Sequence, residues 1–171
     1  PVSVRGGVEG VIAQGGGKVG ESQSSQSPKK QKNGRAQKKP APFRWVNPLE
    51  PSGGKTPGLR HGTFKSPSMD TKVGYCIYLP AEYDKSTGGN KRYPVVYYLH
   101  GGRPGNELKS IKLVAEIDRA ITAQKVAPMI YVFVNGGPVS HYNMPGDSEA
   151  QGADIFINEL IPHIDSTYRT I

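Results

Sequence analysis

Two short apolar runs, each followed by a glycine-rich loop, constrain the fold of this chain more than any other feature. Tyr93–Leu99 (YPVVYYL) leads directly into His100-Gly101-Gly102, and Met129–Val134 (MIYVFV) leads into Asn135-Gly136-Gly137. An unbroken apolar run of this length is typical of a strand that is covered on both faces, as in a parallel sheet. A third β-branched and aromatic run, Val73–Leu79, adds another strand.

Helical patterns alternate with these strands. Residues 110–124 carry apolar side chains at three- and four-residue spacings, and residues 154–168 do the same, with Pro162 expected to kink or restart the second helix. The order strand, strand, helix, strand, helix predicts an α/β fold with a mostly parallel sheet and helices on both faces. Ligands in such folds bind beyond the carboxyl ends of strands, so the loops at 100–107 and 135–151 are the candidate site.

The positive charge of the chain is concentrated at one end. Its formal net charge is +8 over 171 residues, yet residues 1–44 hold nine basic and two acidic side chains, a net +7, which leaves +1 for residues 45–171. Residues 1–44 are rich in Gly, Ser, Gln and Lys, a composition that buries too little apolar surface to offset chain entropy. We expect a disordered tail or linker there, which is either a solubilising connection or a polyanion-binding patch. The chemistry argues against nucleic acid as a partner, because no aromatic side chains for base stacking are interleaved with the lysines.

Composition excludes other classes of protein. No stretch approaches the about 20 apolar residues of a membrane-spanning helix. The single cysteine, Cys76, can form neither an internal disulfide nor a cysteine-built zinc site, and we expect no metal and no cofactor.

Four segments in order carry a resemblance to a known family. They are IYLPAEYD, RYPVVYYLHGG, APMIYVFVNGG and ADIFINELIPHIDSTYRT, and together they span roughly residues 73–170. In that order and at those separations they resemble the esterase family of α/β hydrolases. That family includes esterase D, the feruloyl and acetylxylan esterases of carbohydrate esterase family 1, the enterochelin esterases and the mycolyltransferase antigens. The resemblance implies the α/β-hydrolase fold over residues 45–171.

The resemblance also implies roles for individual residues. The backbone N–H of Gly102 would form half of an oxyanion hole, although a tight strand-to-helix turn is the alternative explanation of Gly101-Gly102. Arg103 matches a polar residue beside the hole in some relatives, and His141 and Tyr142 lie where relatives touch substrate. All three are equally compatible with ordinary exposed loops. His100 has a positional role in this comparison, because the catalytic base of the family lies near the far C-terminus.

The nucleophile that the family requires is not recognisable in this sequence. Its serine sits in Gly-x-Ser-x-Gly, and that pattern does not occur in the 171 residues. We therefore expect the N-terminal half of a serine esterase, truncated before the nucleophile strand and inactive alone. Its substrate would be a small-molecule or polysaccharide-linked ester of the feruloyl or acetyl type, and its location secreted or periplasmic. The alternative is a non-catalytic α/β module whose basic tail binds a polyanion.

Overall fold

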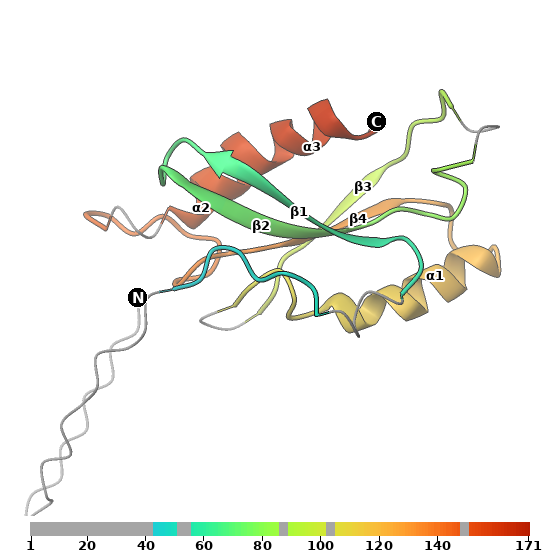
Figure 1. Cartoon of the computed structure of the whole chain (residues 1–171), viewed down its shortest axis with the longest axis horizontal. Coiled ribbons are helices and arrows are strands. Elements are labelled where there is room, and N and C mark those ends of the chain that lie inside the picture. Colours follow the sequence, from blue (N-terminus) through green and yellow to red (C-terminus); the bar gives the residue numbers. More distant parts are fainter. Residues whose placement is uncertain (1–42, 51–55, 86–88, 102–104, 148–150) are drawn as a thin grey trace, which may run out of the picture. The chain divides into compact units, whose positions relative to one another are not determined.

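A mixed β-sheet with helices on both of its faces forms the described part of the chain (Figure 1). The structure is a computed structural model, and it describes residues 43–50, 56–85, 89–101, 105–147 and 151–171. The tail expected at residues 1–44 therefore lies outside the described residues except for its last two positions, and its disorder stays a prediction.

The sheet has the strand order β1-β2-β4-β3. The strands are β1 (Leu59–Ser66), β2 (Thr71–Tyr78), β3 (Val95–Tyr98) and β4 (Ile130–Val134). Three of them coincide with the apolar runs of the sequence. The fourth, β1, has no counterpart among those runs, and it pairs with β2 along its entire length.

Strand direction follows from the connections. The short turn between β1 and β2 makes that pair antiparallel, and β2 also pairs antiparallel with β4. β3 and β4 are parallel, with Val95 opposite Ile130, and a helical crossover joins them. The parallel pairing expected of an α/β fold is thus present at β3–β4, but the described sheet is mixed and not mostly parallel, because the β1–β2 hairpin adds two antiparallel pairings at one edge.

A second parallel contact lies on the other edge of β3. The N–H of Tyr93 donates to the carbonyl oxygen of Arg169 over 2.9 Å, and the N–H of Ile171 donates to the carbonyl oxygen of Tyr93 over 3.0 Å. Tyr93 and Thr170 form a parallel bridge. The chain that leaves the last helix therefore returns beside the start of β3, as a second β-α-β connection would.

The helical segments match the two periodic regions of the sequence. The first comprises the 3₁₀ turn η3 (Ile111–Leu113) and α1 (Val114–Thr122). The second comprises α2 (Gly152–Asp154), the π-helical η4 (Ile155–Leu160) and α3 (Ile161–Thr167). Pro162 is the second residue of α3, so the helix restarts there as expected, after a widened turn. Within the described residues no helix is both long and apolar enough to cross a bilayer.

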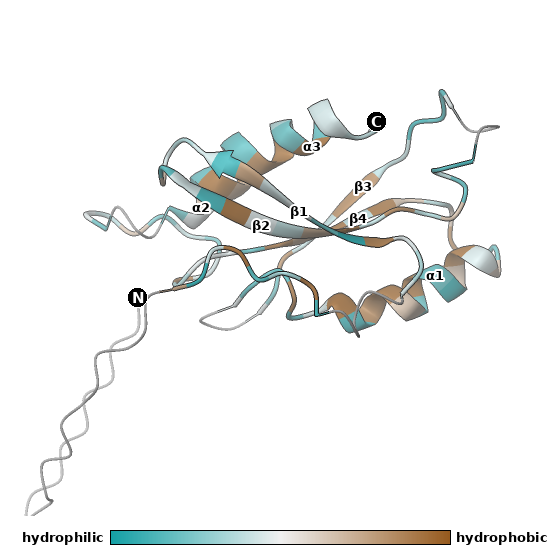
Figure 2. Cartoon of the chain, viewed as in Figure 1, coloured by the Kyte–Doolittle hydropathy of each residue, from teal (hydrophilic) through white to brown (hydrophobic). Residues whose placement is uncertain are grey.

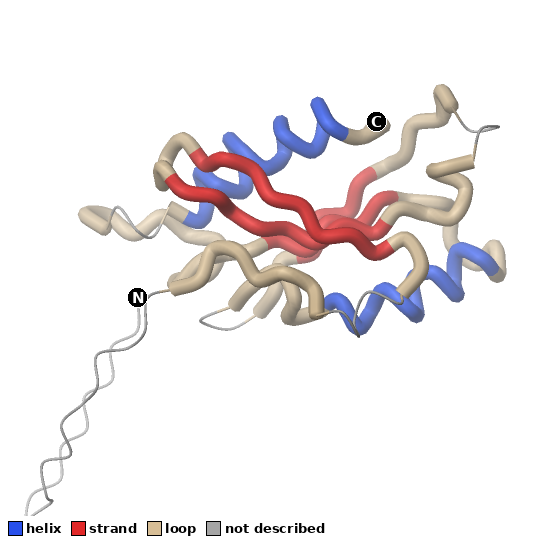
Figure 3. Tube along the Cα trace, viewed as in Figure 1, coloured by secondary structure: helices blue, strands red, loops and turns tan. Residues whose placement is uncertain are grey.

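Figure 3 shows helices on either side of the sheet. Alternation along the strands produces two cores, one on each face. On one face Ile77 and Val132 pack with Ile155, Leu160 and Ile164 from η4 and α3. On the opposite face Cys76, Tyr78 and Phe133 pack with Val114, while Ile117 and Ile121 of α1 lie against them. The hydrophobic stretches of the strands and of α1 are visible in Figure 2. Both faces of β2 and β4 are buried, which explains their continuous apolar runs.

Candidate active site

The candidate site lies where β3 and β4 end. Because these two neighbouring strands are parallel, their carboxyl ends reach the same edge of the sheet. The loop after β3 begins at His100 and reaches Glu107, and the loop after β4 begins at Asn135 and contains His141. The structure thus brings together the two loops that the sequence singles out.

His100 joins the two loops through its side chain. The imidazole is 4 % exposed, and its Nε2 accepts a hydrogen bond of 3.1 Å from the backbone N–H of Gly136. An accepting Nε2 places the proton of the neutral ring on Nδ1. Burial, with a smaller contribution from the nearby positive charge of Lys109, lowers the pKa of His100. The neutral ring is therefore the form that fits the site at pH 7.

Close packing around His100 depends on glycine. A Cβ at Gly105 would overlap the His100 ring, and a Cβ at Gly136 would press on His100 and His141 together. The glycines of both loops therefore let backbone approach the imidazole directly, a role that their sequence pattern indicates only in general terms.

His141 packs against His100. The two ring centroids are 4.7 Å apart, with planes inclined by 48°. Neither ring nitrogen of His141 has a hydrogen-bond partner among the described residues. Burial lowers its pKa, and the neighbouring His100 lowers it further. The next residue, Tyr142, is 58 % exposed at the surface of the same loop.

Glu107 lies beneath the two loops as a fully buried carboxylate. Its Oε1 accepts hydrogen bonds from the Asn47 backbone N–H (2.6 Å) and from His61 Nε2 (3.2 Å). Its Oε2 accepts from the side-chain Nδ2 atoms of Asn47 (3.1 Å) and Asn135 (2.9 Å). One carboxylate thereby links the loop after β3, the loop after β4, strand β1 and the segment that precedes it.

Asn135 extends this network. Its Nδ2 also donates to the carbonyl oxygen of Trp45 (3.1 Å), and its Oδ1 accepts from the Gly137 N–H (3.1 Å). The indole of Trp45 fills the space that a Cβ at Gly137 would occupy, and Gly137 has a positive φ of 75°. The start of the loop after β4 is thus fixed by hydrogen bonds on one side and by an aromatic ring on the other.

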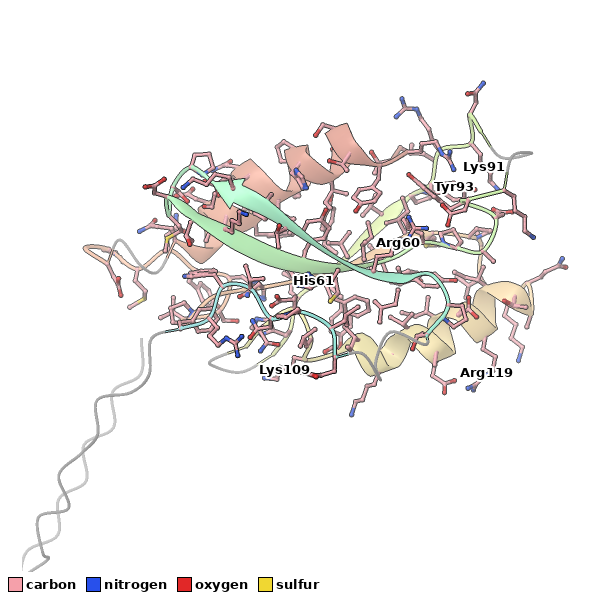
Figure 4. The ribbon with its side chains drawn as sticks, viewed as in Figure 1. Arg60, His61, Lys91, Tyr93, Lys109 and Arg119 are labelled. Carbon is pink, nitrogen blue, oxygen red and sulfur yellow. The ribbon has the colours of Figure 1, made fainter. Side chains whose placement is uncertain are left out.

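Two of the four candidate residues from the sequence, Gly102 and Arg103, lie outside the described residues, so their roles stay predictions. Gly101, which precedes them, is exposed, and a Cβ there would meet nothing within 4 Å. The ammonium of Lys109 donates to the carbonyl oxygen of Gly101. Figure 4 shows Lys109 in the segment that leads into the first helix.

Nucleophilic groups near these loops lack the surroundings that catalysis requires. Ser140 is nearly buried and has a positive φ of 62°, yet no nitrogen of the adjacent His141 ring bonds to it. Cys76 lies opposite His61 in the β1–β2 register, but it is fully buried, and burial, followed by the charge of Glu107, raises the pKa of its thiol to about 12. A thiolate nucleophile is therefore excluded at Cys76.

A metal site and a second cavity are weaker candidates than the site at the ends of β3 and β4. Among the residues that the structure describes, no three His, Cys, Asp or Glu side chains are grouped as they would be around a metal ion. A cavity of about 650 Å³ opens near the end of β2, lined by Tyr78, Pro80, Ile121 and Pro128 among others. It lies at the opposite end of β4 from the candidate site, so we do not connect it with that site's chemistry.

The sequence alone does not predict the Glu107 network. The loop boundaries include both Glu107 and Asn135, but neither residue belongs to a recognisable motif. The available signals were weak: one acidic residue after a glycine-rich loop, and one asparagine after a buried strand. Their pairing depends on contacts between positions 28 residues apart.

Comparison with known proteins agrees with the fold. The model of a family described as "Putative esterase" matches residues 66–171. Esterase Rv1288 of Mycobacterium tuberculosis is 28% identical over 117 residues, which cover 67% of this chain and 24% of that protein. A solved ferulic acid esterase superposes with a TM-score of 0.56 at 26% identity, covering 66% of this chain and 45% of the other. A CE1 ferulic acid esterase from Anaeromyces mucronatus, solved in complex with ferulic acid, gives a TM-score of 0.51 at 25% identity, covering 72% and 47%.

The α/β fold and the two loops at the carboxyl ends of its parallel strands define the class as an α/β hydrolase of the esterase type. Within that class, the chain belongs to the esterase family whose model covers its last 106 residues. It spans about a quarter of the curated relative and just under half of each solved one.

Proposed function

We propose that this chain forms the oxyanion-loop part of a serine carboxylic-ester hydrolase. The observation that carries the proposal is the family match across residues 66–171, combined with a glycine-rich loop at the carboxyl end of β3. Gly101 is exposed, and a second glycine after it has no side chain that would cover its backbone N–H, so this loop would offer N–H groups to a substrate oxygen. The Gly102 N–H would stabilise the negative charge that develops on the ester carbonyl oxygen during acyl transfer.

The nucleophile belongs, in this proposal, to a strand that continues from Thr170. The bridge between Tyr93 and Thr170 supports this, because a strand that continued in the same direction would run parallel to β3 and end beside Gly101. A serine on the turn after such a strand would face the oxyanion loop. The second oxyanion donor, the acid and the base would also lie outside these 171 residues.

The proposed substrate is an ester of an aromatic acid such as ferulate, free or linked to a polysaccharide. Support comes from the solved relatives, which are ferulic acid esterases, one of them with ferulic acid bound. His141 and Tyr142 are the proposed substrate contacts among the described residues, with Arg103 beside the hole. A secreted or periplasmic location goes with this proposal and rests on the family and on the linker-like composition of residues 1–44.

Steady-state hydrolysis of methyl ferulate and p-nitrophenyl acetate tests the proposal. We expect no turnover from residues 1–171 alone, and turnover that a serine-directed sulfonyl fluoride abolishes when the coding sequence after Ile171 is included. Turnover by the 171 residues themselves that resists the serine reagent would contradict the proposed division of the site. Inactivity of the longer product on all esters would contradict the esterase function and favour a binding module.

A further inference from the structure

Glu107 is the one acidic residue that is buried among those the structure describes, and the ester chemistry gives it no role. We propose that Glu107 is a positioning residue: it holds the loop after β3 and the loop after β4 in a fixed relation, so that the oxyanion loop is preorganised for the substrate carbonyl. The catalytic consequence rests on the proposed function. The link that Glu107 makes between the two loops, which we call the clamp, rests on geometry alone.

The donors around Glu107 come from separate parts of the chain. Asn47 precedes the sheet, His61 belongs to β1 and Asn135 follows β4, and together they place four N–H groups on two oxygens. A carboxylate can accept about four hydrogen bonds, so these four donors fill its acceptor capacity. A buried charge is tolerated when it is hydrogen-bonded in this way, and it is costly to disturb.

Two residues of the loop after β3, His100 and Glu107, contact the loop after β4. At the beginning, His100 accepts from the N–H of Gly136; at the end, Glu107 accepts from the side chain of Asn135. Both contacts reach the first residues of the loop after β4. His100 and Glu107 therefore supply two attachment points between the described parts of the two loops, and the one at Glu107 lies farther along the chain.

Strand β2 provides the space for the carboxylate. A Cβ at Gly74 would overlap Glu107 Oε1, and the N–H of Gly74 donates to the Trp45 carbonyl oxygen over 2.7 Å. The Trp45 carbonyl also accepts from Asn135. A glycine at position 74 is thus required for Glu107 to reach all of its donors.

Glu107→Gln tests the proposal without a change of volume. The amide presents N–H groups to the surrounding donors, so the attachment at Asn135 is weakened while the neighbouring shape is retained. In the active enzyme we expect kcat for methyl ferulate to fall on the order of ten- to a hundred-fold with KM nearly unchanged, because misplaced groups reduce catalysis more than binding. We also expect faster amide hydrogen exchange at Gly137, whose N–H is held by Asn135.

Glu159→Gln is the matched control. Glu159 accepts from Ser66 Oγ (2.6 Å) and from the Ser68 N–H (2.8 Å), so the same chemical change breaks a comparable link on the other face of the sheet. We expect this variant to keep kcat, KM and the exchange rate at Gly137. If Glu107→Gln does not fold, Asn47→Ala removes one side-chain donor, keeps the backbone donor, and should lower kcat in the same direction by a smaller factor.

The outcomes separate the clamp from the esterase function. Unchanged exchange at Gly137 in folded Glu107→Gln overturns the proposal, as does unchanged kcat in an enzyme whose loop exchange has accelerated. If the wild-type enzyme hydrolyses no ester, the proposed function fails. Accelerated exchange in Glu107→Gln alone would then still support the clamp, and equal exchange in all variants would overturn it.

Discussion

At the scale of single residues, the site depends on glycines that make room for buried polar side chains. The sequence predicts glycine-rich loops after two strands, and both loops lie at one edge of the sheet. It does not predict that Gly74, inside a strand, faces Glu107, because that contact joins positions 33 residues apart in the chain. A glycine within a strand signals a close approach of some group, but not which group.

Gly74→Ala is the residue-scale prediction. The new Cβ would overlap the Glu107 carboxylate, which accepts four hydrogen bonds and has little freedom to move. We expect the free energy of unfolding to fall by about 1–3 kcal/mol, the usual cost of overpacking, as measured by urea denaturation. Gly101→Ala is the control: its Cβ meets open space, and stability should change by less than about 0.5 kcal/mol. Equal stability of the two variants would argue against the buried network.

At the scale of elements, hydrophobic periodicity identified the helices and buried strands well, because β2, β4 and α1 each bury a regular set of side chains. Boundaries were less accurate. The helix expected over residues 110–124 ends at Thr122, where Gln124 adopts a left-handed conformation with φ of 55°. The N–H of Lys125 donates to the carbonyl oxygen of Ala120, which closes the helix end. Glycine or asparagine is usual at such a position, so a glutamine there does not indicate in the sequence that the helix ends.

Gln124→Gly is the element-scale prediction. A left-handed conformation costs a side-chain-bearing residue about 1–2 kcal/mol, and glycine avoids that cost at the expense of greater freedom in the unfolded chain. We expect a net stabilisation of roughly 0.5 kcal/mol, seen as a higher urea midpoint. Gln124→Ala keeps the Cβ and should give no such gain. A destabilised glycine variant would contradict the assigned helix end.

At the scale of the whole molecule, the fold class followed from the order of elements, but the sheet order did not. Alternating strands and helices indicate an α/β fold; they do not show that β2 inserts between β1 and β4, because strand pairing is decided by long-range packing on both faces. The parallel bridge between Thr170 and Tyr93 likewise does not follow from the order of elements.

Stability should fall on mild acidification. Burial lowers the pKa of His100, His141 and His163, so the unfolded chain, with histidines near their ordinary pKa of about 6.5, takes up protons before the folded protein does. Their contribution is fully present above about pH 6.5 and is lost as pH falls toward the folded-state pKa values. We expect a lower urea midpoint at pH 5.0 than at pH 7.5, with a smaller difference in His141→Gln. A midpoint that rises on acidification would contradict this arrangement of buried neutral rings.

The central claim is that this part of the esterase provides the backbone N–H that stabilises the oxyanion, and kcat of the active enzyme with a changed Gly102 tests it most directly. Gly102→Pro removes the N–H, whereas Gly102→Ala retains it. Loss of one such donor typically lowers kcat by about 10²–10³-fold, so we predict that loss for the proline variant relative to the alanine variant, with KM little changed. Equal kcat values for the two variants would contradict the account.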